Sequence, residues 1–183
     1  MLGILERERF DILACHVFRR RHTERLFPKR KLNGLFLNLR LEDGTLTLID
    51  GQHQKTRAWR VCDMVENFFL ARTQSVRELS GWDERLKVAE HQDFFLRAQR
   101  AGLKVGYTPL AGVDHVQIRR ERGSENYAPF RGYRQAEFRR IWIATHGIRR
   151  FVERDGSSHS AEEWVHLNGW VRPGVARRES TGR

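Results

Sequence analysis

The sequence of 183 residues predicts an α/β fold in which a mixed sheet is flanked by helices. Apolar residues occupy every second position over 35–41, which is the periodicity of a strand. Phe94, Phe95 and Ala98 recur at helical spacing within 90–101, which is typical of a helix with one buried face. Strand-like and helix-like segments then alternate along the chain, as they do in α/β proteins.

The first 50 residues are interpreted as the end of a helix, a buried strand and a hairpin. The helix covers 2–8, and the apolar run over 10–15 is the strand, which we expect the basic cluster at 19–22 to end. The hairpin covers 35–48, because its turn at 42–45 contains Asp-Gly between two alternating runs.

Between residues 64 and 116 strand and helix signals follow one another closely. The expected elements are a strand over 64–71, a helix over 73–79, a turn over 81–83, a helix over 90–101 and a strand over 103–107. Thr73 is the expected N-cap of the first helix. Gly102 is placed to end the second helix, and Pro109 to end the last strand.

The C-terminal third differs in composition, since from residue 119 every basic residue other than histidine is arginine. A helix is expected over 133–146. The stretch after Gly156 is rich in Ser, His and Arg. We divide the chain into a main domain over 1–135, a helical extension over 136–173 and a disordered tail over 174–183.

The net charge of +11 indicates a polyanionic partner: nucleic acid, a nucleotide diphosphate or an anionic membrane surface. No apolar run is long enough to cross a bilayer and no secretory signal starts the chain, so a cytoplasmic location is expected, with peripheral membrane contact compatible with the charge. Cys15 and Cys62 fit two reduced thiols, and the lack of Cys-x-x-Cys argues against structural zinc.

Nucleic-acid binding is a competing hypothesis, with phosphate contacts from the arginines at 19–21, 119–122 and 139–140. No helix-turn-helix, zinc-finger or RNA-binding motif accompanies them. Solvated arginine faces are the simpler interpretation, so no specific nucleic-acid partner is expected.

One segment, residues 67–116, has the features of a chemical site. It contains NFFLART, the turn Gly-Trp-Asp at 81–83, the helix start EHQDFFL at 90–96, the strand AGLKV at 101–105 and Val-Asp-His at 113–115. This order resembles the second half of the GT-A glycosyltransferase fold. More narrowly, it is similar to the beta-1,4-N-acetylgalactosaminyltransferase family, and the resemblance covers roughly residues 8 to 135.

The resemblance implies transfer of a sugar from a UDP-sugar donor to a glycan or lipid-linked acceptor, with inversion and with N-acetylgalactosamine as the candidate sugar. Such a transfer needs a base for the acceptor hydroxyl, a cation for the leaving diphosphate and alignment of both substrates.

The acidic start of the helix over 90–101 supplies the implied catalytic residues. His91 or Glu90 matches the position of the base, and Asp93 is expected to bind or position. Without the resemblance, Glu90 and Asp93 would be interpreted as acids favoured by the helix dipole, on one face of the helix and away from His91.

The resemblance implies that His115 is a ligand of Mn²⁺ or Mg²⁺, although a surface histidine is the simpler alternative. The carboxylates of an Asp-x-Asp motif would complete the site, but the chain contains no such motif. We therefore expect the nucleotide-binding half to lie before residue 1, and the chain by itself to expose an apolar face and a sheet edge. An inactive remnant is the alternative.

Trp82 and Asp83 are expected to border the acceptor, because aromatic faces stack on sugar rings, with core packing as the alternative for Trp82. The residues expected to bond the donor sugar are Asp63, Glu66 and Asn67. Arg72 fits either a ligand or a solvated side chain.

Overall fold

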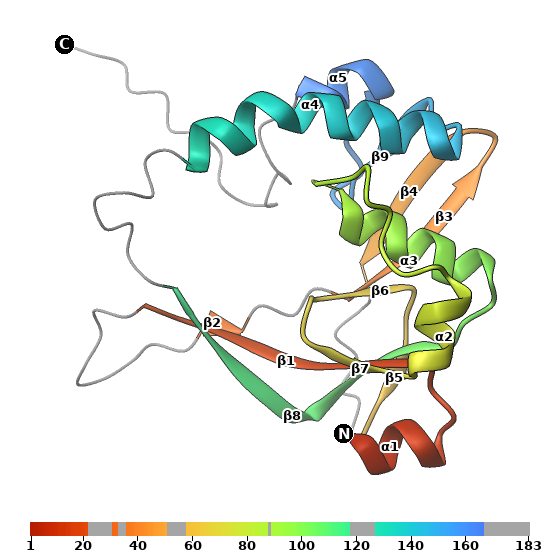
Figure 1. Ribbon diagram of the computed structural model, residues 1–183, viewed down its shortest axis with the longest axis vertical. Coiled ribbons are helices and arrows are strands. Elements are labelled where there is room, and N and C mark those ends of the chain that lie inside the picture. Colours follow the sequence, from red (N-terminus) through yellow and green to blue (C-terminus); the bar gives the residue numbers. More distant parts are fainter. Residues whose placement is uncertain (22–30, 33–35, 51–57, 88, 118–126, 167–183) are drawn as a thin grey trace.

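The computed structural model describes residues 1–21, 31–32, 36–50, 58–87, 89–117 and 127–166 (Figure 1). These residues form an α/β structure with two mixed sheets flanked by helices, so the predicted fold class is confirmed, with two sheets in place of one. The arrangement is consistent with part of a GT-A-like fold.

The first sheet has the strand order β2-β1-β8-β5, with β7 also paired to β1. Its strands are β1 (Ile12–Arg21), β2 (Lys31–Leu32), β5 (Arg60–Val61), β7 (Phe69–Ala71) and β8 (Val105–Gln117). β1 and β8 are parallel. The apolar run at the start of β1 is buried, as expected for a central strand next to a parallel neighbour.

Two expected strand ends are wrong. β1 continues through Arg21, and β8 continues past Pro109 to Gln117. The register of the β1–β8 pair shifts between Cys15 and His16, so that Pro109 and the two residues after it bulge out of the ladder. Proline is tolerated at such a bulge because its missing N–H is not needed there, and pairing resumes beyond it.

The second sheet has the strand order β10-β9-β4-β3-β6. Its strands are β3 (Phe36–Glu42), β4 (Thr45–Asp50), β6 (Met64–Val65), β9 (Arg150–Val152) and β10 (Ser158–Ser160). The β3–β4 hairpin is confirmed, and Asp43 and Gly44 both have positive φ, as a two-residue type I′ turn requires.

The single strand expected over 64–71 is wrong: β6 pairs with β3 in the second sheet, and β7 pairs with β1 in the first. Residues 66–68 carry the chain from one sheet to the other. Further on, β9 pairs in parallel with β4, so the segment expected as a helical extension contributes strands to the second sheet. The domain division itself stays a prediction, and 174–183 lies outside the described residues.

The helices are α1 (Leu2–Arg7), α2 (Thr73–Glu78), α3 (Glu90–Arg100), α4 (Tyr127–His146) and α5 (Ala161–His166). Gly102, with φ of 71°, donates its N–H to the carbonyl of Gln99 and ends α3 as predicted. Thr73 is the first residue of α2 and Arg72 is the N-cap, so the predicted cap is wrong.

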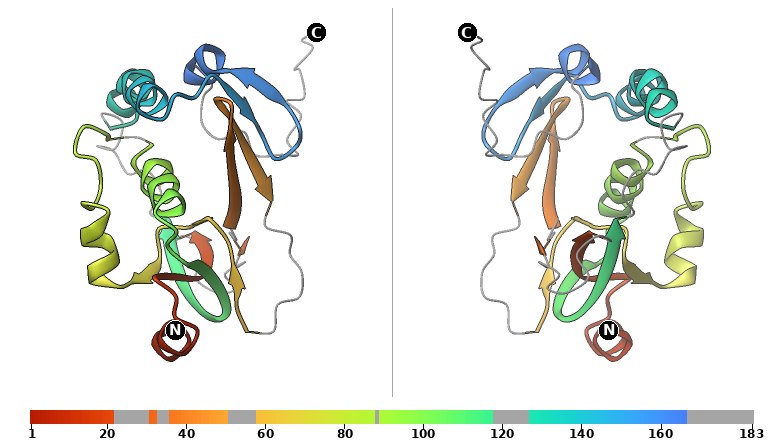
Figure 2. Two further views of the ribbon diagram at one scale, coloured as in Figure 1. Left: turned by 90° about the vertical axis from the view of Figure 1, so that its right-hand side faces the viewer. Right: turned by 90° about the vertical axis from the view of Figure 1, so that its left-hand side faces the viewer.

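α3 lies between α2 and the β3–β4 hairpin, with α4 and α5 at one end of the molecule (Figure 2). Its buried face carries Phe94, Phe95 and Leu96, which join one cluster with Met64 of β6 and Trp142 of α4. Contacts with β6 and with α4 therefore hold α3 in the core. The candidate site lies at the start of this helix.

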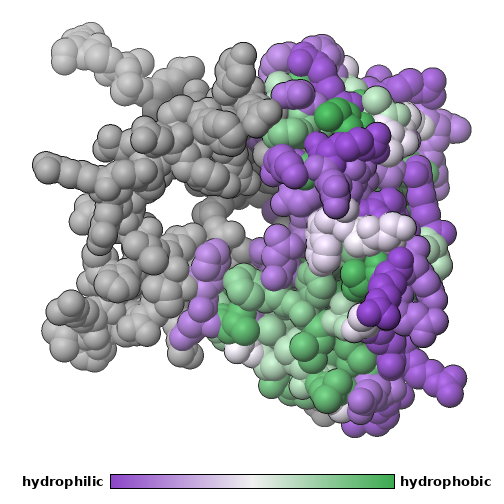
Figure 3. Space-filling model, in the orientation of Figure 1, coloured by the Kyte–Doolittle hydropathy of each residue, from purple (hydrophilic) through white to green (hydrophobic). Residues whose placement is uncertain are grey.

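Apolar side chains are also exposed over the first sheet (Figure 3). Leu110 is 65% exposed, and Val61 and Leu70 are exposed on neighbouring strands. This matches the apolar face expected from the sequence, while its effect on solubility stays a prediction.

Candidate functional site

α3 begins at Glu90, directly after Ala89, whose φ of 70° turns the chain sharply into the helix. Glu90 and Asp93 occupy the first turn, where the helix dipole favours negative charge. Their surroundings differ, because Glu90 is half-buried and Asp93 is 1% exposed. Of the two carboxylates, only that of Glu90 is therefore open to solvent.

Both oxygens of Asp93 are held by donors. Its Oδ1 lies 2.8 Å from Nε2 of His146 on α4, and its Oδ2 accepts from Nε of Arg97 at 2.7 Å. Burial alone would raise the pKa of Asp93, but the hydrogen bonds from His146 and Arg97 outweigh it and lower that pKa. A carboxylate held in this way is a poor proton acceptor, so the geometry favours the positioning role expected for Asp93.

His91 is held by the main chain of β6, since its Nε2 lies 2.6 Å from the carbonyl oxygen of Val65. A carbonyl only accepts, so Nε2 carries the proton and Nδ1 carries the lone pair. Burial lowers the pKa of His91 and keeps the imidazole neutral. Nδ1 is buried and has no hydrogen-bond partner among the described residues.

These features distinguish His91 from Glu90, the two candidates for the catalytic base. His91 has the right protonation state, but its lone pair is enclosed, and its ring packs edge-on against Phe95 at 4.9 Å. Glu90 reaches solvent. An acceptor hydroxyl can approach Glu90 in this conformation, whereas it reaches Nδ1 of His91 only after neighbouring groups move.

The crossing segment 66–68 lies between the two histidines of the predicted site. Its start is next to the carbonyl of Val65 that binds His91, and at its end the ring of Phe68 lies 5.6 Å from that of His115. Of the two predicted donor-binding residues in between, Glu66 is half-buried and Asn67 is exposed. The fold thus brings together three parts of the predicted site that lie up to 50 residues apart in sequence.

Asp63 has a structural use. Its Oδ2 accepts from the backbone N–H of Leu39 at 2.7 Å, and Gln99 of α3 bonds both Asp63 and the Leu39 carbonyl. Burial raises the pKa of Asp63 against these hydrogen bonds. Asp63 therefore helps to tie β3 to α3, and this use of its carboxylate competes with sugar binding.

Trp82 lies on the surface, with 44% of its area exposed, so core packing is wrong for this residue. Its ring stacks on that of Phe94 at 4.6 Å and 10°, and Phe94 stacks in turn on Phe69. The neighbouring Asp83 bonds Arg85 within the same turn, and the Arg85 guanidinium lowers the pKa of Asp83 to about 2. An aromatic face supported by the buried ring of Phe94, next to a fixed carboxylate, can bind a sugar.

The residues around His115 do not by themselves fit a metal ion. Asp114 and His115 are both exposed near the end of β8. Within the described ranges, no three His, Cys, Asp or Glu side chains lie close enough to hold a cation together. His115 as a metal ligand stays a prediction, and we derive no reaction step through a metal.

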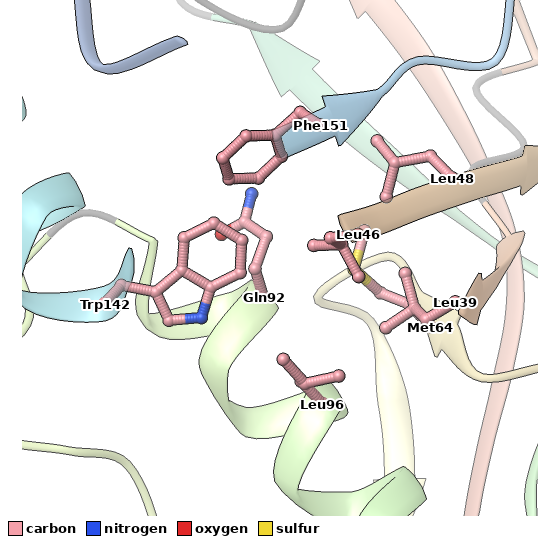
Figure 4. A pocket seen from close by; sticks show the side chains of 8 residues that line it. All are labelled: Leu39, Leu46, Leu48, Met64, Gln92, Leu96, Trp142 and Phe151. Carbon is pink, nitrogen blue, oxygen red and sulfur yellow. The ribbon is translucent and has the colours of Figure 1, made fainter. Parts of the chain in front are cut away.

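A small apolar cavity lies between α3, Trp142 of α4 and the second sheet (Figure 4). Gln92, Leu96 and Trp142 line it together with side chains of the second sheet. Its volume of about 10 Å³ is at the lower limit for one water molecule. It is therefore too small for a sugar or a nucleotide.

The remaining predicted features are mainly internal. Cys15 and Cys62 are free and buried, and burial raises the pKa of Cys62 to about 12. Arg139 is buried and donates to the carbonyls of Trp164 and Val165 at the end of α5, and Arg140 pairs with Glu162.

These contacts argue against phosphate binding at 139–140. The side chains of 19–21 and the segment 119–122 lie outside the described residues. Arg72, which was open between ligand and solvated side chain, donates to the carbonyl of Phe10. It therefore has a structural contact with the chain before β1.

Sequence reasoning missed two residues of the buried network, Arg97 and His146. Arg97 follows Asp93 by four positions, the spacing of an ion pair on a helix, so a signal was present. His146 lies 53 residues from Asp93, and no local pattern connects them.

No helix in the described part of the chain is both long enough and apolar enough to span a bilayer.

Comparison with known proteins supports the family resemblance. No protein-family model matches the chain. The chain is 43% identical over 77 residues to human beta-1,4 N-acetylgalactosaminyltransferase 1, a match that covers 39% of this chain and 14% of the relative. The mouse and rat proteins of the same name are 40% identical over the same shares. Over about two-fifths of its length, the chain is thus similar to a short segment of a glycosyltransferase.

Proposed function

We propose that this chain is the acceptor-side part of a glycosyltransferase, which transfers a sugar from a UDP-sugar to a glycan or lipid-linked acceptor with inversion. The relatives' printed name makes N-acetylgalactosamine the candidate sugar. The net charge of +11 favours a diphosphate donor or an anionic membrane surface. The proposal relies most on the exposed ring of Trp82, stacked on buried Phe94.

The proposed reaction is a single displacement. A base, Glu90 or His91, takes the proton of an acceptor hydroxyl whose sugar ring lies against Trp82. The hydroxyl oxygen forms a bond to the anomeric carbon as the bond to the diphosphate breaks on the opposite face, and UDP leaves with that electron pair. Glu66 and Asn67 are the proposed contacts for the donor sugar. Metal dependence, with His115 as one ligand, stays a prediction from the resemblance.

Binding of the acceptor can be tested on the chain as it is. Titration with mono- and disaccharides, N-acetylgalactosamine and galactose among them, should change the tryptophan fluorescence, and Trp82→Ala should abolish this change. Trp82→Phe should retain part of the affinity, because it keeps a smaller aromatic face. Trp59→Phe is the matched control, since Trp59 packs on Phe10.

Turnover is tested separately, as release of UDP from UDP-N-acetylgalactosamine in the presence of Mn²⁺ and the sugar that binds best. Glu90→Gln and His91→Asn should then identify the base, because the essential one lowers kcat by roughly 10²-fold or more. Sugar binding that Trp82→Ala leaves unchanged, or saturating sugars without any fluorescence change, would contradict the proposal.

A further inference from the structure

We infer that Arg97 is a positioning residue that fixes the turn bearing Trp82, and that Asp93 and His146 hold Arg97 in place. The inference rests on the proposed function, because it has these residues support the acceptor platform, the turn at 79–83 whose Trp82 ring is proposed to bind the acceptor sugar. It concerns the buried polar groups of α3 and α4 that the proposed reaction does not use.

The turn after α2 has an unusual backbone. Ser80 and Gly81 both have positive φ, of 58° and 65°. The N–H of Ser80 donates to the carbonyl of Arg77 and that of Gly81 to the carbonyl of Val76, which is the pattern of a Schellman cap. Serine carries a cost at the left-handed position that glycine would avoid, so external contacts are needed to hold this conformation.

Arg97 provides those contacts from α3. Its Nη1 donates to the carbonyl of Leu79 and its Nη2 to the carbonyl of Gly81 at 2.8 Å, one on each side of Ser80. Trp82 follows Gly81 directly. Because the planar guanidinium presents its donors in a fixed fork, the two bonds fix the direction in which the chain enters Trp82.

The third donor of Arg97 connects the turn to α4. Nε of Arg97 bonds Oδ2 of Asp93, whose Oδ1 accepts from Nε2 of His146. The Nδ1 atom of His146 lies 2.8 Å from Nη1 of Arg100, and since a guanidinium only donates, Nδ1 accepts this hydrogen bond while Nε2 donates to Asp93. In the series from Arg100 through His146 and Asp93 to Arg97, each hydrogen bond thus joins one donor to one acceptor.

Burial makes this network rigid. The side chains of Asp93 and His146 are 1% and 2% exposed, so water cannot replace either partner. If one of these side chains moved away, a buried donor or acceptor would lose its partner. The free-energy cost of that loss keeps the other side chains in place. The turn that bears Trp82 is therefore fixed in part through His146, the last residue of α4.

The decisive variant is Arg97→Lys, which keeps the charge next to Asp93 but loses the fork to the two carbonyls. Hydrogen exchange followed by mass spectrometry should show amides of residues 79–86 exchanging roughly tenfold faster or more, with α3 and the second sheet unchanged. Asp93→Asn should loosen the same segment to a smaller extent. Arg77→Lys, on the exposed side of α2, is the matched control and should change nothing.

Sugar affinity gives the second measurement. Arg97→Lys should weaken the binding seen by Trp82 fluorescence about tenfold although Trp82 is intact. Unchanged exchange at 79–86, or exchange that is faster across the whole chain, would overturn the positioning role. If the wild-type chain binds no sugar but Arg97→Lys still loosens the turn, the positioning role stands and the proposed function fails.

Discussion

The turn bearing Trp82 and the end of β8 bearing His115 are both implicated by the resemblance, yet they are held in different ways. The turn is supported from within, because Arg97 binds its carbonyls and Phe94 supports the indole. At the end of β8, Asp114 and His115 are exposed and extend beyond the buried part of the strand. One region has its supporting contacts within the described chain, and the other presents side chains outward.

This difference indicates which kind of binding site the described residues can form without further ligands. A surface that stacks on a sugar needs one rigid aromatic face, and the described residues provide it. A cation needs several ligands around one point, and the described residues supply no such group near His115. Four measurements test this contrast between the two regions.

The largest effect is expected for Asp93→Ala, which leaves His146 and Arg97 without their shared acceptor. Loss of one partner in a buried charged network should lower the free energy of unfolding by about 3–5 kcal/mol. Urea denaturation followed by circular dichroism measures this loss. Glu162→Ala, in an exposed pair with Arg140, is the control and should leave the midpoint unchanged. Equal midpoints for the two variants would show that the network does not stabilise the fold.

A smaller loss is expected from Gly106→Ala, in the buried part of β8. An added Cβ would collide with the ring of Phe10, which is fully buried and cannot move away, so we expect a loss of about 1–3 kcal/mol by the same assay. Gly112→Ala, toward the His115 end, meets the half-buried ring of Phe18 and should cost less. Gly3→Ala meets nothing within 4 Å and is the control. A Gly112 variant as unstable as the Gly106 variant would show that the outer end is as constrained as the inner one.

The next effect is a pH dependence from His91. Burial holds its pKa below the ordinary value of 6.5, so near pH 6 the unfolded chain binds more protons than the folded one. Its contribution to stability is therefore fully present above pH 6.5 and is lost as the pH falls through the folded pKa. His91→Gln should flatten this part of the curve of unfolding free energy against pH, and a curve that stays equally steep would contradict the assignment.

The smallest effect is expected for His115→Ala. The side chain is exposed and its ring contact is with Phe68, itself 37% exposed, so the urea midpoint should not change measurably. A clear loss of stability would show that this end of β8 depends on His115 for packing, and would remove the contrast with the Trp82 turn.

Local patterns were sufficient for much of the fold. The hairpin at 36–50 followed from alternation and Asp-Gly, and α3 from its apolar spacing and Gly102. Patterns failed where the sheets decided the outcome: Pro109 did not end β8 because a bulge accommodates it, and 64–71 divided into strands of two different sheets. Neither a bulge nor a change of sheet has a signature in local periodicity.

The same limit applies to the site. The acidic helix start, the Gly-Trp-Asp turn and the family resemblance could be recognised from the sequence, because each depends on residues close together in the chain. Three properties became visible only in the folded protein: the carboxylate of Asp93 is hydrogen-bonded by His146 and Arg97, the lone pair of His91 is enclosed, and Trp82 is exposed. The reason is physical: protonation, burial and support of a side chain depend on partners that folding brings together from distant parts of the chain.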